Sequence, residues 1–250
     1  MISADVIVIG AGIVGAACAH ELAAAGLSVH VIDARKGGAT NAGMGHLVVM
    51  DDNPAELALS QSSLDLWHQW GPRMNADQPT CQFTNCGTLW VAANAEEMAA
   101  AEEKQERLRA HGIACELLGP AALAAAEPLL RPGLAGALKV GGDSVVYAPN
   151  AAEWLLTHAP RPIRFEQAEV TRIEGRSVRL ADGGTRSAGA VLLAAGIDAP
   201  RLCPGLPIRP KKGHLAITER HPGLLRHQLV ELGYITSAHH SDGTSVAFNL

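Results

Sequence analysis

The sequence predicts an α/β fold in which a domain with a parallel β-sheet is interrupted by a second domain with an antiparallel sheet. Residues 5–33 predict the first domain, because a strand, a glycine-rich turn, a helix and another strand follow one another there. The regular alternation of strands and helices then stops, and a continuous apolar strand of the buried type returns only at residues 191–195. This order indicates that the chain leaves the parallel sheet and later comes back to it.

The first strand, at residues 6–9, is the β-branched run Val-Ile-Val-Ile, which is typical of a strand covered on both faces. A helix follows at residues 13–25, where apolar residues recur at helical spacing, and Gly26 ends it. The second strand takes residues 28–32, and Asp33 closes it.

The remaining elements are predicted from helical or alternating spacing and from glycine and proline boundaries. Helices are expected at residues 54–70, 95–111, 120–128 and 150–158. Strands are expected at residues 88–93, 135–146 (two strands and a turn), 164–167, 170–173, 178–180, 213–218, 229–236 and 244–250. We expect residues 1–80 and 150–210 to form a discontinuous first domain, and residues 81–149 and 211–250 to form the second.

The composition is that of a globular protein: of 250 residues, 48% are hydrophobic and 18% are charged. A net charge of −5 argues against a nucleic-acid partner, because a phosphate-binding surface needs an excess of lysine and arginine. The five cysteines form no Cys-x-x-Cys pair and the histidines have no ligand spacing, so we expect reduced thiols and no metal site. The sequence shows neither a secretory signal nor a membrane-spanning stretch, and we expect a cytoplasmic protein.

A G-x-G-x-x-G motif begins at Gly10, after the first strand and before the helix. In such a motif Gly10 permits the tight turn, Gly12 lets the backbone approach a diphosphate, and Gly15 lets helix and strand pack closely. The amides of the first helical turn, at Ile13 and Val14, then face the anion at the positive end of the helix dipole. The motif therefore predicts a site for the diphosphate of an adenine dinucleotide.

Asp33 ends the next strand at about the distance that this motif requires. Its carboxylate would accept hydrogen bonds from the ribose hydroxyls of the adenosine. An acid at this position favours a 2′-hydroxyl over a 2′-phosphate, so NADP is not expected as the ligand. We expect the next two residues, Ala34 and Arg35, to contact the cofactor as well.

A small, polar segment at residues 40–46 could pass close to a flavin and donate backbone amides to its diphosphate or ring. The alternative is an ordinary glycine loop on the surface. The candidate cofactor contacts in this segment are Thr40, Asn41, Ala42, Gly43 and Met44.

His46 and His214 are candidate proton carriers, although a structural or exposed role is the more common one for a scattered histidine. His214 follows a small basic cluster of Arg209, Lys211 and Lys212. This cluster either approaches a substrate carboxylate or the flavin, or forms a solvated turn.

Taken as a whole, the sequence resembles the FAD-dependent D-amino-acid oxidase superfamily, and within it the branch of glycine oxidase, sarcosine oxidase and hydroxyproline dehydrogenase-like proteins. This resemblance rests first on the motif at residues 5–15 with Asp33, and on the loop at residues 39–44. It rests also on Val170-Thr171 with the run at residues 191–196, and on the segment Pro210-Lys-Lys-Gly-His214.

The resemblance implies a Rossmann-type FAD-binding domain interleaved with an antiparallel-sheet substrate domain. It implies that the Val170 backbone meets the adenine and that Ala194, Ala195 and Gly196 lie beside the diphosphate. It also implies that residues 210–214 form the strand that leaves the FAD-binding domain. Tyr234 is the candidate for contact with the substrate, with an ordinary strand tyrosine as the alternative.

Members of this family continue with further strands and a glycine-rich segment that caps the flavin, and a carboxylate-binding arginine often lies there too. The sequence has no counterpart of that part after Leu250. We therefore expect a C-terminally truncated chain with an incomplete substrate domain.

The resemblance implies oxidation of the C–N bond of a small amino or imino acid, of the D-amino acid, D-hydroxyproline, sarcosine or glycine type, by hydride transfer to flavin N5. No side-chain base is needed, and no catalytic residue is assigned. Oxygen, a quinone or an electron-transfer partner would reoxidise the flavin, and peripheral membrane or hetero-subunit contact stays open. The alternatives are an FAD-dependent 2-hydroxy-acid or glycerol-phosphate dehydrogenase, with His46 or His214 as base, and an inactive truncated nucleotide-binding chain.

Overall fold

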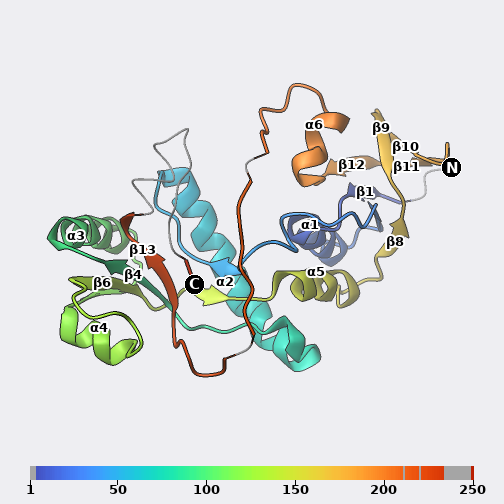
Figure 1. Cartoon of the computed structure of the whole chain (residues 1–250). Coiled ribbons are helices and arrows are strands. Elements are labelled where there is room, and N and C mark those ends of the chain that lie inside the picture. The colour runs from blue at the N-terminus through green and yellow to red at the C-terminus, as the bar shows by residue number, and fades with distance from the viewer. Residues whose placement is uncertain (1–3, 211, 220, 234–248) are drawn as a thin grey trace. The chain divides into compact units, whose positions relative to one another are not determined.

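A computed structural model describes residues 4–210, 212–219, 221–233 and 249–250 (Figure 1). The chain forms two compact units. The first comprises Met1–Gly43, Asp77–Cys81 and Tyr147–Ala216, and the second comprises Met44–Ala76, Gln82–Val146 and Ile217–Leu250. The sequence-based boundary at residue 80 differs from this division, because Met44–Ala76 packs with the second unit.

The first unit contains a parallel sheet in the order β12-β1-β2-β8. Its strands are β1 (Val6–Ile9), β2 (Val29–Asp33), β8 (Arg164–Gln167) and β12 (Ala190–Leu193). The helix α1 (Ile13–Ala24) joins β1 to β2, as the sequence predicts. All of β1 is buried, which explains why its sequence is a continuous apolar run rather than an alternating one.

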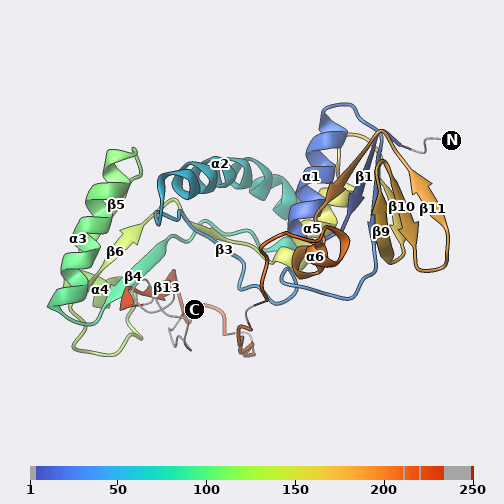
Figure 2. The same cartoon turned by 90° about the horizontal axis from the view of Figure 1, so that it is seen from above.

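Both faces of this sheet are covered (Figure 2). On one face Val8 and Val31 share a core with Ala19 of α1. The helix α1 also packs against α5 (Ala148–Thr157). On the other face Ile7 and Ile32 share a core with a three-stranded antiparallel sheet. That sheet consists of β9 (Val170–Glu174), β10 (Ser177–Leu180) and β11 (Thr185–Ser187). The short helices η2 (Gly196–Asp198) and α6 (Ala199–Leu202) follow β12 in the same unit.

The second unit contains a mostly antiparallel sheet in the order β13-β4-β6-β5. Its strands are β4 (Thr88–Ala92), β5 (Cys115–Leu118), β6 (Gly136–Val140) and β13 (Gln228–Glu231). Its helices are α2 (Pro54–Asp77), α3 (Ala95–Ala110) and α4 (Pro120–Ala126), while the short helix η1 (Pro79–Cys81) belongs to the first unit. Leu64 of α2 and Leu108 of α3 share one core with the sheet. A two-stranded ladder joins β3 (His46–Leu47) to β7 (Ser144–Val145).

The helix α2 is longer than the sequence predicts, because it passes Gly71 and Pro72 and reaches Asp77. A Cβ at Gly71 would lie 2.2 Å from the Phe83 ring, so the missing side chain lets the ring pack against the helix backbone. Met74, one turn further on, is fully buried. This packing outweighs the local tendency of glycine and proline to end a helix.

The strand expected at residues 213–218 is wrong, because the structure has no regular element there. Residues 212–219 are exposed, so their alternating apolar side chains have no partner surface, and Ile217 is 91% exposed. The strand implied for residues 210–214 is likewise wrong at residues 210 and 212–214, which have no regular structure, and Lys211 lies outside the described residues. The strand expected at residues 229–236 is confirmed only in part, since β13 ends at Glu231. Residues 234–236 and most of the strand expected at 244–250 lie outside the described residues.

Candidate functional site

The glycine turn lies at the carboxyl end of β1, directly before α1. Gly10 has a φ of +104°, and a Cβ there would lie 2.4 Å from the carbonyl oxygen of Ala194. A Cβ at Gly15 would lie 2.0 Å from the carbonyl oxygen of Gly10. Neither position can take a side chain without a shift of the backbone, so both glycines are required by the turn itself.

Gly12 differs from the other two glycines. A Cβ at Gly12 would meet only the Thr40 hydroxyl oxygen, at 3.0 Å, and nothing else within 4 Å. Gly12 is the N-cap residue of α1, and the Ile13 amide donates a hydrogen bond to Thr40 Oγ1 at 2.9 Å. The space before the helix is therefore bordered by the Thr40 hydroxyl. Since the first amides of a helix have no partner within it, this space suits an anion.

Asp33 stands beside this turn, at the same edge of the parallel sheet. Its Oδ2 accepts a hydrogen bond from the Ala11 amide at 2.7 Å, and its Oδ1 accepts one from the Arg35 amide at 2.5 Å. Each carboxylate oxygen keeps a further lone pair with which to accept a ligand hydroxyl. Arg35 has a φ of +56°, and its guanidinium lies 4.5 Å from the centroid of the Phe165 ring. The guanidinium thus lies over β8.

The second half of the first unit returns to the glycine turn through β12. The Ala194 amide donates to the Ile9 carbonyl at 2.8 Å, so Ala194 continues alongside the end of β1. Ala195 and Gly196 follow directly, and Gly196 has a φ of +54°. Val170 is buried in the core that also contains Ile9. The residues expected beside a diphosphate, which are far apart in sequence, therefore converge on one turn.

The loop residues expected beside a flavin are mostly exposed. Thr40 alone is shown in contact with the turn, through the Ile13 amide. The Asn41 and Ala42 amides donate within the loop, to Gly38 and Ala39. Asn41, Ala42 and Gly43 are exposed in the first unit, and Met44, which is 42% exposed, opens the second.

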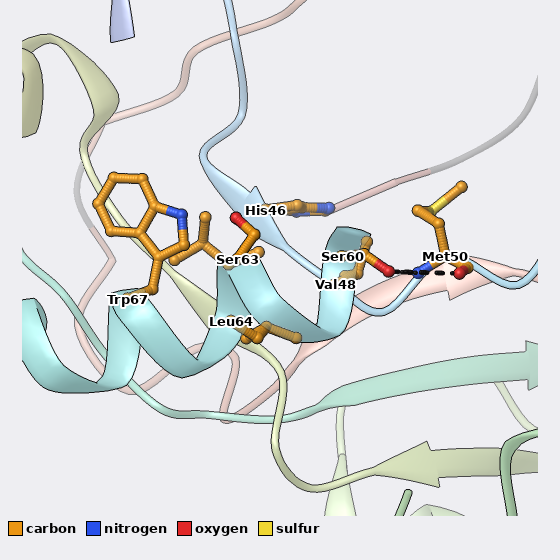
Figure 3. A pocket seen from close by; sticks show the side chains of 8 residues that line it. His46, Val48, Met50, Ser60, Ser63, Leu64 and Trp67 are labelled. Carbon is orange, nitrogen blue, oxygen red and sulfur yellow. Dashed lines mark hydrogen bonds between the residues drawn. The ribbon is translucent and has the colours of Figure 1, made fainter. Parts of the chain in front are cut away.

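A pocket of about 210 Å³ lies within the second unit (Figure 3). One wall comes from the segment that follows the loop, and consists of His46, Leu47, Val48 and Met50. The other wall is one face of α2, and consists of Ser60, Ser63, Leu64 and Trp67. These four positions have the spacing i, i+3, i+4, i+7. Among these eight residues the sequence pointed to His46 alone. The spacing on α2 indicates an amphipathic helix, but it does not show that the helix borders a cavity.

Burial lowers the pKa of His46, and a hydrogen bond with the backbone of Leu250 partly opposes this effect. His214 is exposed in the segment without regular structure, and so are Arg209 and Lys212. Lys211 and Tyr234 lie outside the described residues. Within residues 4–210, 212–219, 221–233 and 249–250, no group of three or more His, Cys, Asp or Glu side chains could hold a metal ion. None of the helices in that part of the chain is long and apolar enough to span a membrane.

Comparison with known proteins places these features in a family. Residues 5–246 match the model of the family described as FAD dependent oxidoreductase. The bifunctional protein MnmC of tRNA 5-methylaminomethyl-2-thiouridine biosynthesis, from Burkholderia mallei, is 32% identical over 79% of this chain. Its match covers 32% of MnmC, so the chain spans about a third of that relative's length.

Two solved structures are similar to the chain. Glycine oxidase from Geobacillus kaustophilus matches with a TM-score of 0.71 and 26% identity, over 80% of this chain and 57% of the oxidase. L-Proline dehydrogenase from P. horikoshii matches with a TM-score of 0.75 and 21% identity, over 93% of this chain and 65% of the dehydrogenase. The family match covers nearly all of the sequence, and the chain belongs to the family of FAD-dependent oxidoreductases, with FAD as its cofactor.

Proposed function

We propose that this protein oxidises the C–N bond of a small amino or imino acid, with FAD held at the glycine turn of the first unit. The observation that carries the proposal is the glycine turn before α1, where a Cβ at Gly12 would meet only the Thr40 hydroxyl oxygen and where the Asp33 carboxylate accepts a hydrogen bond from the Ala11 amide. The similarity to a glycine oxidase supports an amine carbon as the site of oxidation.

The residues of the turn fit the diphosphate of FAD. An anion before α1 meets the positive end of the helix dipole and the Val14 amide of its first turn, while the Ile13 amide is held by the Thr40 hydroxyl. The Thr40 hydroxyl accepts from the Ile13 amide, so its own proton is free to reach a phosphate oxygen. Gly12 leaves the approach open, since its only close neighbour is that same hydroxyl.

Asp33 fits the ribose of the adenosine. Its carboxylate is fixed by two backbone amides and still accepts hydroxyl hydrogen bonds. A 2′-phosphate would meet this carboxylate as a like charge, which excludes NADP from the site.

The other contacts with FAD follow from their positions around the turn. Val170 would offer its backbone to the adenine, with Ala34 and Arg35 beside the adenosine. The diphosphate would lie along Ala194, Ala195 and Gly196. The loop that begins at Thr40 would follow the flavin ring with Asn41, Ala42, Gly43 and Met44. Tyr234 is kept as the candidate substrate contact.

Bound FAD supplies an acceptor for a hydride from the α-carbon of the substrate. The task of the chain is to align that carbon and to keep water away from it. No base from the described residues is assigned to the reaction. Oxygen, or a quinone or electron-transfer partner, would take the electrons. MnmC acts on tRNA by its name, but the net charge of −5 disfavours a nucleic acid as substrate here.

Anaerobic bleaching of the flavin band tests this function. We expect bleaching of the FAD-loaded protein by at least one compound among D-amino acids, D-hydroxyproline, sarcosine and glycine, because the site is assigned to C–N oxidation. Lactate and glycerol 3-phosphate serve as controls and should leave the band unchanged. Bleaching by these controls alone would favour a dehydrogenase of 2-hydroxy acids or glycerol phosphate. A flavin that no amine bleaches would refute the proposal.

A further inference from the structure

We propose that the Glu169 carboxylate bridges three chain segments around the glycine turn, and that screening of this bridge by salt speeds the release of FAD. The effect on FAD rests on the proposed function, while the bridge itself stands on ion pairs within the first unit. Glu169 is a positioning residue, because it acts through its neighbours and not by touching the flavin.

Glu169 makes ion pairs with two segments that are far from it in sequence. Its Oε1 lies 2.8 Å from Lys36 Nζ, in the loop after β2, and 3.0 Å from Arg201 Nη2, in α6. Arg201 also pairs with Asp198 of η2, at 3.5 Å. Hydrogen bonds from Lys36 and then from Arg201 lower the pKa of Glu169, so its carboxylate is ionised at neutral pH. One carboxylate thus serves two cations at once.

Each of the three bridged segments also carries residues that we propose as FAD contacts. The loop with Lys36 continues directly from the adenosine contacts at residues 33–35. Glu169 directly precedes Val170, whose backbone is proposed to meet the adenine. The helix α6 follows soon after the diphosphate contacts at residues 194–196. The bridge therefore fixes the spacing between the contacts for the two halves of the nucleotide.

The bridged segments differ in how firmly they are held. The Glu169 carbonyl accepts a hydrogen bond from the Ala181 amide at 2.9 Å, which fixes its backbone to the end of β10. The helix α6 is anchored by Leu202, which packs against the core of the first unit. Residues 35–39 are all exposed, by contrast. The ion pair of Lys36 therefore holds a loosely packed loop against two firmly packed segments.

The ion pairs are exposed enough for salt to weaken them. The side chains of Lys36 and Arg201 are each 55% exposed, and that of Glu169 is 31% exposed. The Debye length is about 10 Å at 0.1 M salt and about 3 Å at 1 M, so added salt screens such pairs. A single exposed pair contributes little to stability, but this bridge orders the loop before FAD binds, which lowers the cost of binding.

The rate at which FAD leaves the loaded protein tests the proposal. The protein is diluted, and flavin fluorescence follows the release at about 0.02 M and about 0.5 M NaCl. We expect this increase in salt to speed release from the wild type about fivefold. The variant Glu169→Gln should release FAD about fivefold faster than the wild type at low salt, and salt should change its rate by less than about twofold. The variant Lys36→Gln, which breaks one of the two pairs, should lie between them.

The variant Glu174→Gln is the matched control. Glu174 also lies between two cations, at 3.6 Å from Arg172 and 3.3 Å from Arg179. These three residues belong to the hairpin of β9 and β10, so the control loses an equivalent charge without releasing a segment of the FAD site. Its rate of FAD release should follow that of the wild type at both salt concentrations.

Hydrogen–deuterium exchange of the FAD-free protein tests the bridge without the cofactor. The Asn41 and Ala42 amides donate within the loop and report on its order. We expect Glu169→Gln to speed exchange at residues 36–43 by about threefold or more, because the loop loses its ion pair with Lys36. Exchange in the Glu174→Gln control should match that of the wild type.

The outcomes separate the bridge from the proposed function. Equal exchange at residues 36–43, or equal FAD release, in the wild type and Glu169→Gln overturns the proposal. Slower release by Glu169→Gln overturns it as well, because Lys36 and Arg201 would then bind the diphosphate themselves. If the wild type takes up no FAD, the proposed function and the effect on FAD release both fail, and exchange alone decides the bridge.

Discussion

The variant Gly12→Val should lose the ability to retain FAD while keeping its fold. The added Cβ lies 3.0 Å from the Thr40 hydroxyl oxygen and within 4 Å of no backbone atom outside its own turn, so the Thr40 side chain has to shift by a few tenths of an ångström while the backbone of the turn stays in place. Its two methyl groups, however, occupy the space before α1 through which the diphosphate must approach. We expect FAD affinity to fall by at least about 100-fold, equivalent to roughly 3 kcal/mol. Titration of FAD fluorescence measures the affinity, and circular dichroism reports the fold.

The variant Gly38→Val is the matched control for this experiment. Gly38 belongs to the loop beside the turn, and a Cβ there meets nothing within 4 Å. Its FAD affinity should stay within about twofold of the wild-type value. Gly10 and Gly15 are poor choices, because a side chain at either position strikes the backbone and would disturb the turn itself. Unchanged flavin content in the Gly12 variant would show that the diphosphate binds elsewhere.

The stability of the fold should depend on pH through Asp143, a residue of the second unit that is 1% exposed. Burial raises the pKa of Asp143 to about 6, against opposing effects from Thr88, the Val49 amide and Lys104. An unperturbed aspartate has a pKa of 3.8, so between pH 3.8 and about pH 6 the folded protein holds a proton that the unfolded chain has released. Folded protein is therefore favoured by acid in this window, and stability falls as the pH rises from 4 to 7.

The expected size of this loss is about 3 kcal/mol in the free energy of unfolding, since each pKa unit corresponds to roughly 1.4 kcal/mol. The variant Asp143→Asn keeps an acceptor for the Val49 amide but cannot ionise. Urea unfolding at pH 4 and pH 7 should show the wild type losing about 3 kcal/mol relative to this variant, while Asp65→Asn, an exposed control on α2, tracks the wild type. Parallel curves for the wild type and Asp143→Asn would contradict a raised pKa for the buried Asp143 carboxyl.

The unit from β1 to β2 could be predicted in full because its signals are local. The apolar run, the three glycines and the closing Asp33 all lie within about 30 residues. The strand expected at residues 213–218 failed for the opposite reason. Its alternating pattern is real, but a strand needs a neighbour, and sequence spacing does not show whether one is present.

The pocket and Asp143 escaped sequence reasoning for related reasons. The Ser60, Ser63, Leu64 and Trp67 face of α2 has the spacing of any amphipathic helix. Whether such a face fills a core or borders a cavity depends on the opposing segment, which lies outside that helix in sequence. Gly141-Gly142-Asp143 has the composition of a surface turn. Asp143 is nevertheless buried, and its carboxylate accepts a hydrogen bond from the Val49 amide, 94 residues away in sequence.

We propose that the glycine turn with Asp33 binds FAD and not a 2′-phosphorylated nucleotide. The most direct test of this proposal is a fluorescence titration of the purified protein with FAD, followed by competition with NADP⁺. We expect saturation at one FAD per chain and no displacement by millimolar NADP⁺, because the Asp33 carboxylate repels the 2′-phosphate. A folded protein that takes up no FAD, or one that releases FAD to NADP⁺, would contradict it.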